Sequence, residues 1–234
     1  QIQQNLLERV AEINENIAVV LFSGRPLDLR DVQVKAKAIL EVWMPGTEGA
    51  GAITDVLYGR YNPTGKLPMS FPYCVGQVPV HYNEYATGRP HVEGKDKDRF
   101  RSKYLDIPNA PLYPFGYGLS YTTFEYGPLR LDRETLRRGE RLTAEVEVSN
   151  CGAMDGKETV MWFVSDPTAS ISRPVRELKH FEKQFIPAGE SRVFRFEIDP
   201  VRDLSFPDHT GKRLLENGAF YLHVNGQKVK FELI

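Results

Sequence analysis

Two glutamates in this 234-residue sequence occupy positions where a carboxylate could act in catalysis or bind a ligand. Glu48 begins a predicted short helix directly after a predicted strand, at the edge where α/β sheets collect ligands. Glu84 lies in "HYNEYATGRP" with Arg89 and two tyrosines, whose side chains can bind sugar hydroxyls. Glycoside cleavage needs two carboxyl groups, one to protonate the leaving oxygen and one as nucleophile or base. Plainer roles also fit, because Glu48 suits the helix dipole and a loop packed on a neighbouring domain accounts for the tyrosines.

Other catalytic templates do not match the sequence. The five histidines show no close metal-ligand spacing, and no Cys-x-x-Cys is present. Ser23 in "FSGRP" lacks the glycine two positions earlier that a nucleophile elbow needs. In "EGAGAIT", Thr54 occupies the place of the third glycine of a dinucleotide fingerprint. We therefore expect neither a metal nor a cofactor.

The balance of basic and acidic residues limits the classes of partner that the chain could bind. Thirty basic and thirty-one acidic residues give no electrostatic footprint for nucleic acid or an anionic membrane. The sequence also has no apolar run near the roughly eighteen residues that a membrane helix needs. The charge balance therefore fits a neutral or small polar partner better than nucleic acid or a membrane.

Cys74 and Cys151 lie far apart in the sequence, so two free thiols are expected, although a disulfide bridge between them stays open.

Residues 1–60 predict part of an α/β domain. Apolar residues recur every three or four positions from Ile2 to Ile13, which indicates a helix. "IAVVLF" and "AILEVW" are typical of parallel strands, and "PGTEGAGAITDVLYG" predicts a turn and a helix capped by Thr47 and ending at Gly59. Two strands cannot cover their own faces, so we expect the missing strands of this sheet to lie upstream.

Residues 61–121 predict a long irregular connection that packs on the α/β body. Its end, "PLYPFGYGLSY", carries rings that we expect to fill the junction with the following domain. The charged stretch Glu93–Lys103 is expected to be solvated surface.

Residues 122–234 predict an all-β sandwich of the immunoglobulin or fibronectin type III kind. Apolar and polar residues alternate in "RLTAEVEVSN" and "RVFRFEID", so each segment shows one face to a core. Asn225-Gly226 between "AFYLHV" and "KVKFELI" predicts a tight hairpin. Trp162 in "VMWFVS" is predicted to lie in the core. No helix is predicted in this part of the chain.

Several long motifs, in order, resemble the C-terminal part of glycoside hydrolase family 3, the β-glucosidase and β-xylosidase group. The resemblance continues through "VSNCGAMDGKETVMWFVSD" and "SRPVRELKHFEK" into the fibronectin type III-like domain of that family. It covers essentially the whole chain, more loosely after Asp199. The other motifs that carry it are "VVLFSGRPLDL", "VWMPGTEGAGAITDVLYGRYNPTGKLPMSFP", "VGQVPVHYNEYATGRP" and "PLYPFGYGLSYTTFEY".

The resemblance implies a parent enzyme with a TIM barrel, an α/β sandwich domain and a terminal β-sandwich. Such enzymes hydrolyse terminal β-linked sugars with retention. It also implies that both catalytic carboxylates, an Asp of the barrel and a Glu upstream of Ile2, lie outside this chain. No catalytic residue is therefore assigned, and Glu48 and Glu84 are not candidates for that role. The "TGRP" loop matches one that lies toward the active-site side in relatives, so Arg89 and Glu84 are the candidate substrate-binding residues, while a contact of Arg89 with the barrel or a purely structural role stays open.

From these features we expect the C-terminal region of a retaining, exo-acting β-glucosidase-like enzyme that is inactive by itself. Its partners would be the barrel of the same protein and a β-linked oligosaccharide or aryl glycoside. Glucose and xylose both fit as the sugar, and the cytoplasm, the periplasm and the exterior all fit as the location. Two alternatives are a carbohydrate-binding module, with stacking faces on Tyr82, Tyr85 and Trp162, and a sandwich that pairs subunits into a homodimer.

Overall fold

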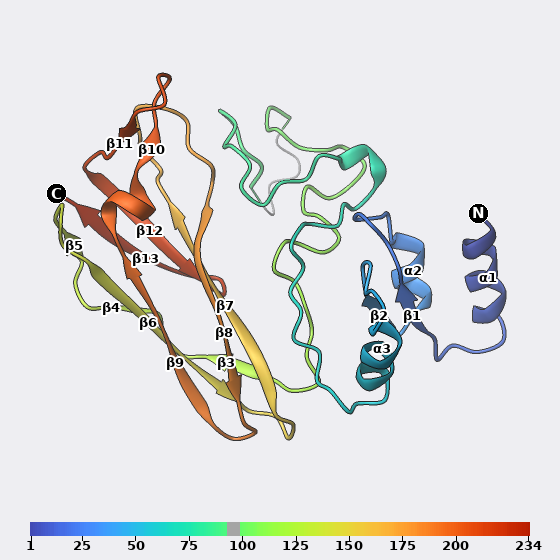
Figure 1. The fold of residues 1–234 in the computed structure, drawn as a ribbon. Coiled ribbons are helices and arrows are strands. Elements are labelled where there is room, and N and C mark those ends of the chain that lie inside the picture. The colour runs from blue at the N-terminus through green and yellow to red at the C-terminus, as the bar shows by residue number, and fades with distance from the viewer. Residues whose placement is uncertain (93–98) are drawn as a thin grey trace. The chain divides into compact units, whose positions relative to one another are not determined.

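The computed structural model describes residues 1–92 and 99–234. The chain forms two compact units (Figure 1). Unit 1 comprises Gln1–Tyr61, Leu67–Tyr82 and His91–Tyr117, and unit 2 comprises Asn62–Lys66, Asn83–Pro90 and Gly118–Ile234. The segment 61–121, predicted as one connection, thus contributes to both units. Most of the charged stretch predicted as solvated surface, residues 93–98, lies outside the described residues.

Unit 1 contains a parallel strand pair with short helices around it. Strand β1 pairs with β2 in parallel, with Ala18 opposite Ala38 and Leu21 opposite Glu41, which confirms the predicted pair. The bounds are α1 Ile2–Ala11, β1 Ala18–Leu21, α2 Arg30–Lys35, β2 Ala38–Glu41, α3 Gly49–Leu57 and the 3₁₀ turn η1 Val75–Gln77.

Two local details of unit 1 differ from the sequence predictions. Helix α2 was not predicted, because its six residues carry no apolar stripe and Val34 is 85% exposed. Helix α3 is capped at Glu48 rather than Thr47, and the Glu48 side chain makes no capping hydrogen bond. The helix itself begins and ends close to the predicted positions.

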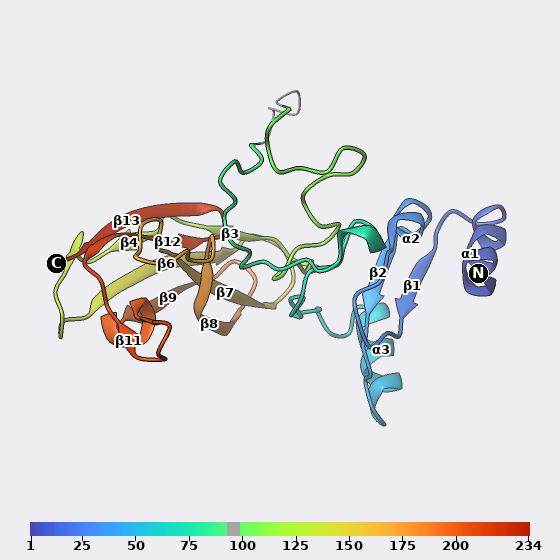
Figure 2. The same ribbon diagram turned by 90° about the horizontal axis from the view of Figure 1, so that it is seen from above.

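Much of the apolar surface of unit 1 is open. Helix α1 stands beside α2 (Figures 1 and 2) and is joined to it by polar contacts, such as that between Lys35 Nζ and Glu8 Oε1 at 3.3 Å. The stripe of α1 that predicted the helix is exposed, with Leu6 at 64% and Ile13 at 88%. No residue of β1 or β2 is fully buried. The described residues of unit 1 therefore do not cover the two faces of this strand pair.

The irregular segments of unit 1 pack through aromatic rings. Phe71, only 1% exposed, forms an isolated antiparallel bridge with Tyr113. Tyr113 lies 5.1 Å from the ring of Tyr117, and Tyr82 stacks on Phe115 at 4.3 Å. These rings of the predicted junction segment thus pack inside unit 1, and their role toward another domain stays a prediction.

Unit 2 consists mainly of two sheets, as predicted for a β-sandwich. One sheet is five-stranded with the order β5-β13-β12-β7-β8; the other has the order β3-β6-β4, with β9 also paired to β6. The bounds are β3 Phe124–Tyr126, β4 Arg130–Leu131, β5 Thr135–Leu136, β6 Leu142–Asn150, β7 Gly156–Ser165, β8 Glu177–Ile186, β9 Ser191–Ile198, β10 Phe206–Pro207, β11 Arg213–Leu214, β12 Gly218–Val224 and β13 Gln227–Leu233.

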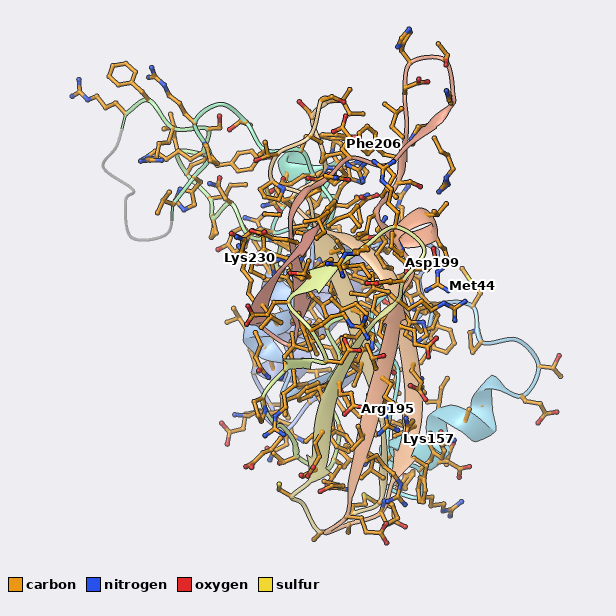
Figure 3. All side chains as sticks on the ribbon, turned by 90° about the vertical axis from the view of Figure 1, so that its left-hand side faces the viewer. Met44, Lys157, Arg195, Asp199, Phe206 and Lys230 are labelled. Carbon is orange, nitrogen blue, oxygen red and sulfur yellow. The ribbon has the colours of Figure 1, made fainter. Side chains whose placement is uncertain are left out.

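The core of unit 2 lies between the alternating inner faces of these strands. Trp162 and Phe194 are fully buried, which confirms the alternation and the prediction for Trp162. Asn225 (φ 45°) and Gly226 (φ 79°) form the turn between β12 and β13, as predicted from this dipeptide. The prediction of no helix was wrong at one point. A π-helical turn, Pro200–Leu204, forms because Asp199 caps it (Figure 3).

Gly118 occupies a place in unit 2 that admits no side chain. A Cβ there would lie 2.2 Å from the carbonyl oxygen of Gly65, a backbone atom that cannot rotate away. We expect Gly118→Ala to lower the free energy of unfolding by about 2 kcal/mol, measured by urea denaturation. Gly65→Ala is the matched control, because its Cβ would meet no atom within 4 Å. Equal stability of the two variants would contradict the prediction.

Candidate functional site

The C-terminal ends of the parallel strands β1 and β2 lie together at one edge of the strand pair in unit 1. Strand β1 ends at Leu21 and β2 ends at Glu41, and these two residues are paired. Ligands of parallel α/β sheets collect at this edge, in the loops that follow the strands. Ser23 follows β1 and Trp43 follows β2, so both stand in such loops.

Glu41 connects these two loops. Its Oε1 accepts a hydrogen bond from the backbone N–H of Trp43 at 2.8 Å. Ser23 Oγ lies 3.2 Å from each carboxyl oxygen of Glu41 and 3.0 Å from the carbonyl oxygen of Arg25. Ser23 is 6% exposed. Burial raises the pKa of Glu41, and the Trp43 N–H opposes this rise by favouring the charged form.

Trp43 has a backbone conformation that is unusual for a bulky residue. Its φ is +49°, in the left-handed region that L-residues other than Asn and Asp rarely adopt. Its ring lies 5.8 Å from that of Phe71 and stays partly exposed, and the next residue, Met44, is 74% exposed (Figure 3). Strained residues of this kind gather at functional sites. The corner of Ser23, Glu41 and Trp43 is therefore the candidate site of unit 1.

The sequence prediction missed this corner. The apolar run "AILEVW" predicts one continuous strand, and Ser23 lacks the glycine that a nucleophile elbow needs. One available signal was Glu41 itself, a carboxylate interrupting an otherwise apolar strand. Glu48, the residue that the strand-edge rule indicated, is exposed at the start of α3.

The predicted substrate-binding residues, Glu84 and Arg89, share the segment 83–90 of unit 2, and both are exposed. The carbonyl oxygen of Glu84 accepts a hydrogen bond from Val175 N at 2.8 Å, and Tyr85 forms an isolated bridge with Pro174. The backbone of this segment is thus fixed on the chain just before β8. The substrate-binding role of the two side chains stays a prediction.

The three stacking faces considered for a carbohydrate-binding module differ in exposure. Trp162 is fully buried, Tyr82 stacks on Phe115, and Tyr85 is 62% exposed.

Among residues 1–92 and 99–234, no group of three or more His, Cys, Asp or Glu side chains could hold a metal ion. Cys74 and Cys151 are free thiols, as expected. None of the helices within the described ranges is long and apolar enough to cross a membrane.

Two family models match the chain in order. Residues 1–121 match the glycosyl hydrolase family 3 C-terminal domain, and residues 158–228 match a fibronectin type III-like domain. The first match ends four residues after unit 1 does, and the second falls entirely within unit 2.

Similar proteins carry the names of glycosidases. A periplasmic β-glucosidase of Salmonella typhimurium is 44% identical over the whole chain, which covers 31% of that protein. A β-xylosidase of Formosa agariphila is 37% identical over 95% of the chain, which covers 30% of it. The crystal structure of a β-glucosidase from Listeria innocua in complex with isofagomine matches 99% of the chain with a TM-score of 0.92 at 40% identity.

The chain spans about a third of the length of these proteins, 30% to 33%. The family match extends over more than half of the chain, and the order of the two matched domains agrees with the α/β and all-β units of the structure. The chain therefore belongs to glycosyl hydrolase family 3, as its C-terminal domain followed by a fibronectin type III-like domain.

Proposed function

We propose that this chain is the C-terminal region of a retaining, exo-acting glycosidase that hydrolyses terminal β-linked sugars, as a β-glucosidase does. The observation that carries the proposal is the 44% identity, along the whole chain, to a protein named as a β-glucosidase. In the whole enzyme, a β-linked oligosaccharide or aryl glycoside would be the substrate. Retaining catalysis needs two carboxyl groups about 5 Å apart in one cleft, and we assign neither of them to this chain.

The open surface of unit 1 supports this proposal. The apolar stripe of α1 and the incompletely covered β1–β2 pair are surfaces that normally pack against further secondary structure. Burying them would contribute roughly 25 cal/mol for each Å² removed from water. We propose that they pack on the rest of the α/β domain, and that the barrel of the same protein completes the enzyme.

The isolated chain is expected to be inactive. Purified chain incubated with an aryl β-glucoside or an aryl β-xyloside should release the aryl group no faster than a mixture without protein. The Salmonella typhimurium β-glucosidase is the positive control on the glucoside, and the Formosa agariphila β-xylosidase is the positive control on the xyloside. Hydrolysis by the isolated chain above the background rate would show a complete active site and contradict the proposal.

Subunit pairing is a second proposed role, favoured by one observation on β8. This strand is at the edge of the five-stranded sheet, and Phe181 and Phe185, four residues apart on one face, are 62% and 50% exposed. We expect a homodimer that buries these rings, visible by light scattering after size-exclusion chromatography. Phe181→Ser with Phe185→Ser should give a monomer, whereas Val193→Ser, at a half-exposed position on β9, should not. A wild-type monomer at high concentration would exclude this role.

A further inference from the structure

Two cations of unit 2 lie on aromatic rings at the outer face of the five-stranded sheet. Arg176 Cζ lies 4.8 Å from the centre of the Phe163 ring, and Lys228 Nζ lies 3.9 Å from the centre of the Tyr221 ring. Both rings alternate along their strands with residues of the buried core, so they point to the outer face. Contacts of this kind hold a flexible cationic side chain in one place.

The register of the strands brings the two cations together around His223. This residue of β12 is paired with Phe163 of β7 on one side and with Lys228 of β13 on the other. Phe163 and Tyr221 are diagonal neighbours in the β7–β12 pair, and such neighbours lie about 7 to 8 Å apart. The guanidinium over one ring and the ammonium over the other are therefore close enough for one anionic group to contact both.

Neither cation forms a salt bridge with an acidic side chain among the residues that the structure describes. The acidic residues that are near them in these strands are engaged elsewhere. Glu177, at the start of β8, contacts Arg173 at 2.6 Å. Glu232 of β13 contacts Lys230 at 2.7 Å (Figure 3). The two positive charges are therefore left for a partner outside the described chain.

His223 is the third group at this place. Ser165 Oγ lies 2.7 Å from Nε2 of His223 and 2.6 Å from the carbonyl oxygen of Val175, so the imidazole ring is held in position. Burial lowers the pKa of His223, and the charges of Lys228 and Arg176 lower it further. Both cations thus act on this ring, and an anion between them would offset their repulsion.

We propose that Arg176, His223 and Lys228 form a binding site for an acidic saccharide, whose uronate carboxylate lies between the two cations. The guanidinium supplies planar donors that match a carboxylate, and the ammonium adds a point charge. The choice of a saccharide rests on the proposed function, because a glycosidase acts on carbohydrate. A single nucleic-acid strand fits this place less well. Its bases need open rings to stack on, whereas both rings are covered by their cations and Phe163 is only 8% exposed.

NMR titration of the full chain with a β-linked mannuronate tetramer tests the site. The backbone amide signals of His223 and Lys228 should shift as the tetramer is added, and added salt should reverse the shift because it screens surface charges. Cellotetraose, a neutral β-linked tetramer, is the control ligand and should leave these signals in place at the same concentration. A mannuronate titration without these shifts at low salt would overturn the proposal, and so would an equal response to cellotetraose.

Two double variants distinguish a built site from attraction by net charge. Arg176→Gln with Lys228→Gln should weaken binding of the mannuronate tetramer about tenfold, as the combined effect of two surface charges. Arg130→Gln with Lys212→Gln is the matched control, since it removes the same charge from exposed positions elsewhere in unit 2. This control should change the affinity less than about twofold. Equal losses in the two double variants would contradict the proposal. The wild-type titration decides the matter by itself if the first double variant does not fold.

Two further ligands test the class of anion. Inorganic phosphate should bind more weakly than the mannuronate tetramer, because it lacks the hydroxyls and further carboxylates of the saccharide. Phosphate that binds as tightly, or a single-stranded DNA tetranucleotide that binds more tightly, would overturn the assignment to a saccharide. These measurements follow binding without catalysis. A failure here therefore leaves the proposed hydrolysis of β-linked sugars to be decided by activity assays.

Discussion

Replacing Trp162 with alanine is expected to lower the free energy of unfolding of unit 2 by about 3 to 5 kcal/mol. Trp162 is the largest fully buried side chain, and its ring lies 5.9 Å from that of Phe196 across the core. Truncation leaves a cavity that strands on both sheets can close only in part. Urea denaturation followed by circular dichroism in the β region would measure the loss.

Trp162→Phe is the matched control, and it should cost much less. The indole Nε1 of Trp162 is buried without a hydrogen-bond partner among the described residues. Phenylalanine keeps most of the apolar ring and removes this unsatisfied donor, whose burial is itself unfavourable. We expect a loss of about 1 kcal/mol or less, because the volume change and the removed donor act in opposite directions. A Phe variant as unstable as the Ala variant would contradict this account of the core.

Replacing Asn150 with alanine is expected to cost about 3 kcal/mol, since several buried groups lose their partners at once. Asn150 is 1% exposed. Its Nδ2 donates to the carbonyl oxygens of Met154 and Ile186, both at 2.9 Å. Its Oδ1 accepts from Thr122 Oγ1 at 2.5 Å and from Gly152 N at 3.2 Å. Thermal unfolding of unit 2 would show the change as a lower midpoint.

The neighbouring residue supplies the control for Asn150. Ser149 is on the opposite side of β6, where its hydroxyl meets that of Ser191 at 2.8 Å near the surface. Ser149→Ala should change the stability by no more than about 0.5 kcal/mol. If the two alanine variants unfold at the same temperature, the side-chain bonds of Asn150 do not stabilise the turn after β6.

Where the sequence predicted the fold well, a local pattern determined the structure. The apolar runs of β1 and β2 and the alternation in β6 and β9 each lie within a single segment, and in β6 and β9 the alternation matches the buried positions. The Asn225-Gly226 turn follows from two residues that tolerate a positive φ. Helix α2 has no such pattern, because its six residues bury no apolar face.

The candidate site was less predictable because it depends on contacts between distant segments. Ser23 and Glu41 meet only because the parallel register places Leu21 opposite Glu41. Likewise, Asn150 bonds to Ile186 across 36 positions of sequence, which a turn signal in "SNCGAMDG" does not indicate. The rule that ligands collect after parallel strands indicated Glu48, the N-cap of α3, whereas the carboxylate at the corner is Glu41, the last residue of β2.

A chimeric enzyme gives the most direct test of the central claim, that this chain completes a β-glucosidase-like enzyme. The corresponding 31% of the periplasmic β-glucosidase of Salmonella typhimurium would be replaced by this chain, and hydrolysis of an aryl β-glucoside would be measured. The account predicts an active chimera, while the Salmonella protein without its last third and this chain alone both stay at background. A folded chimera that is as inactive as these two parts would contradict it.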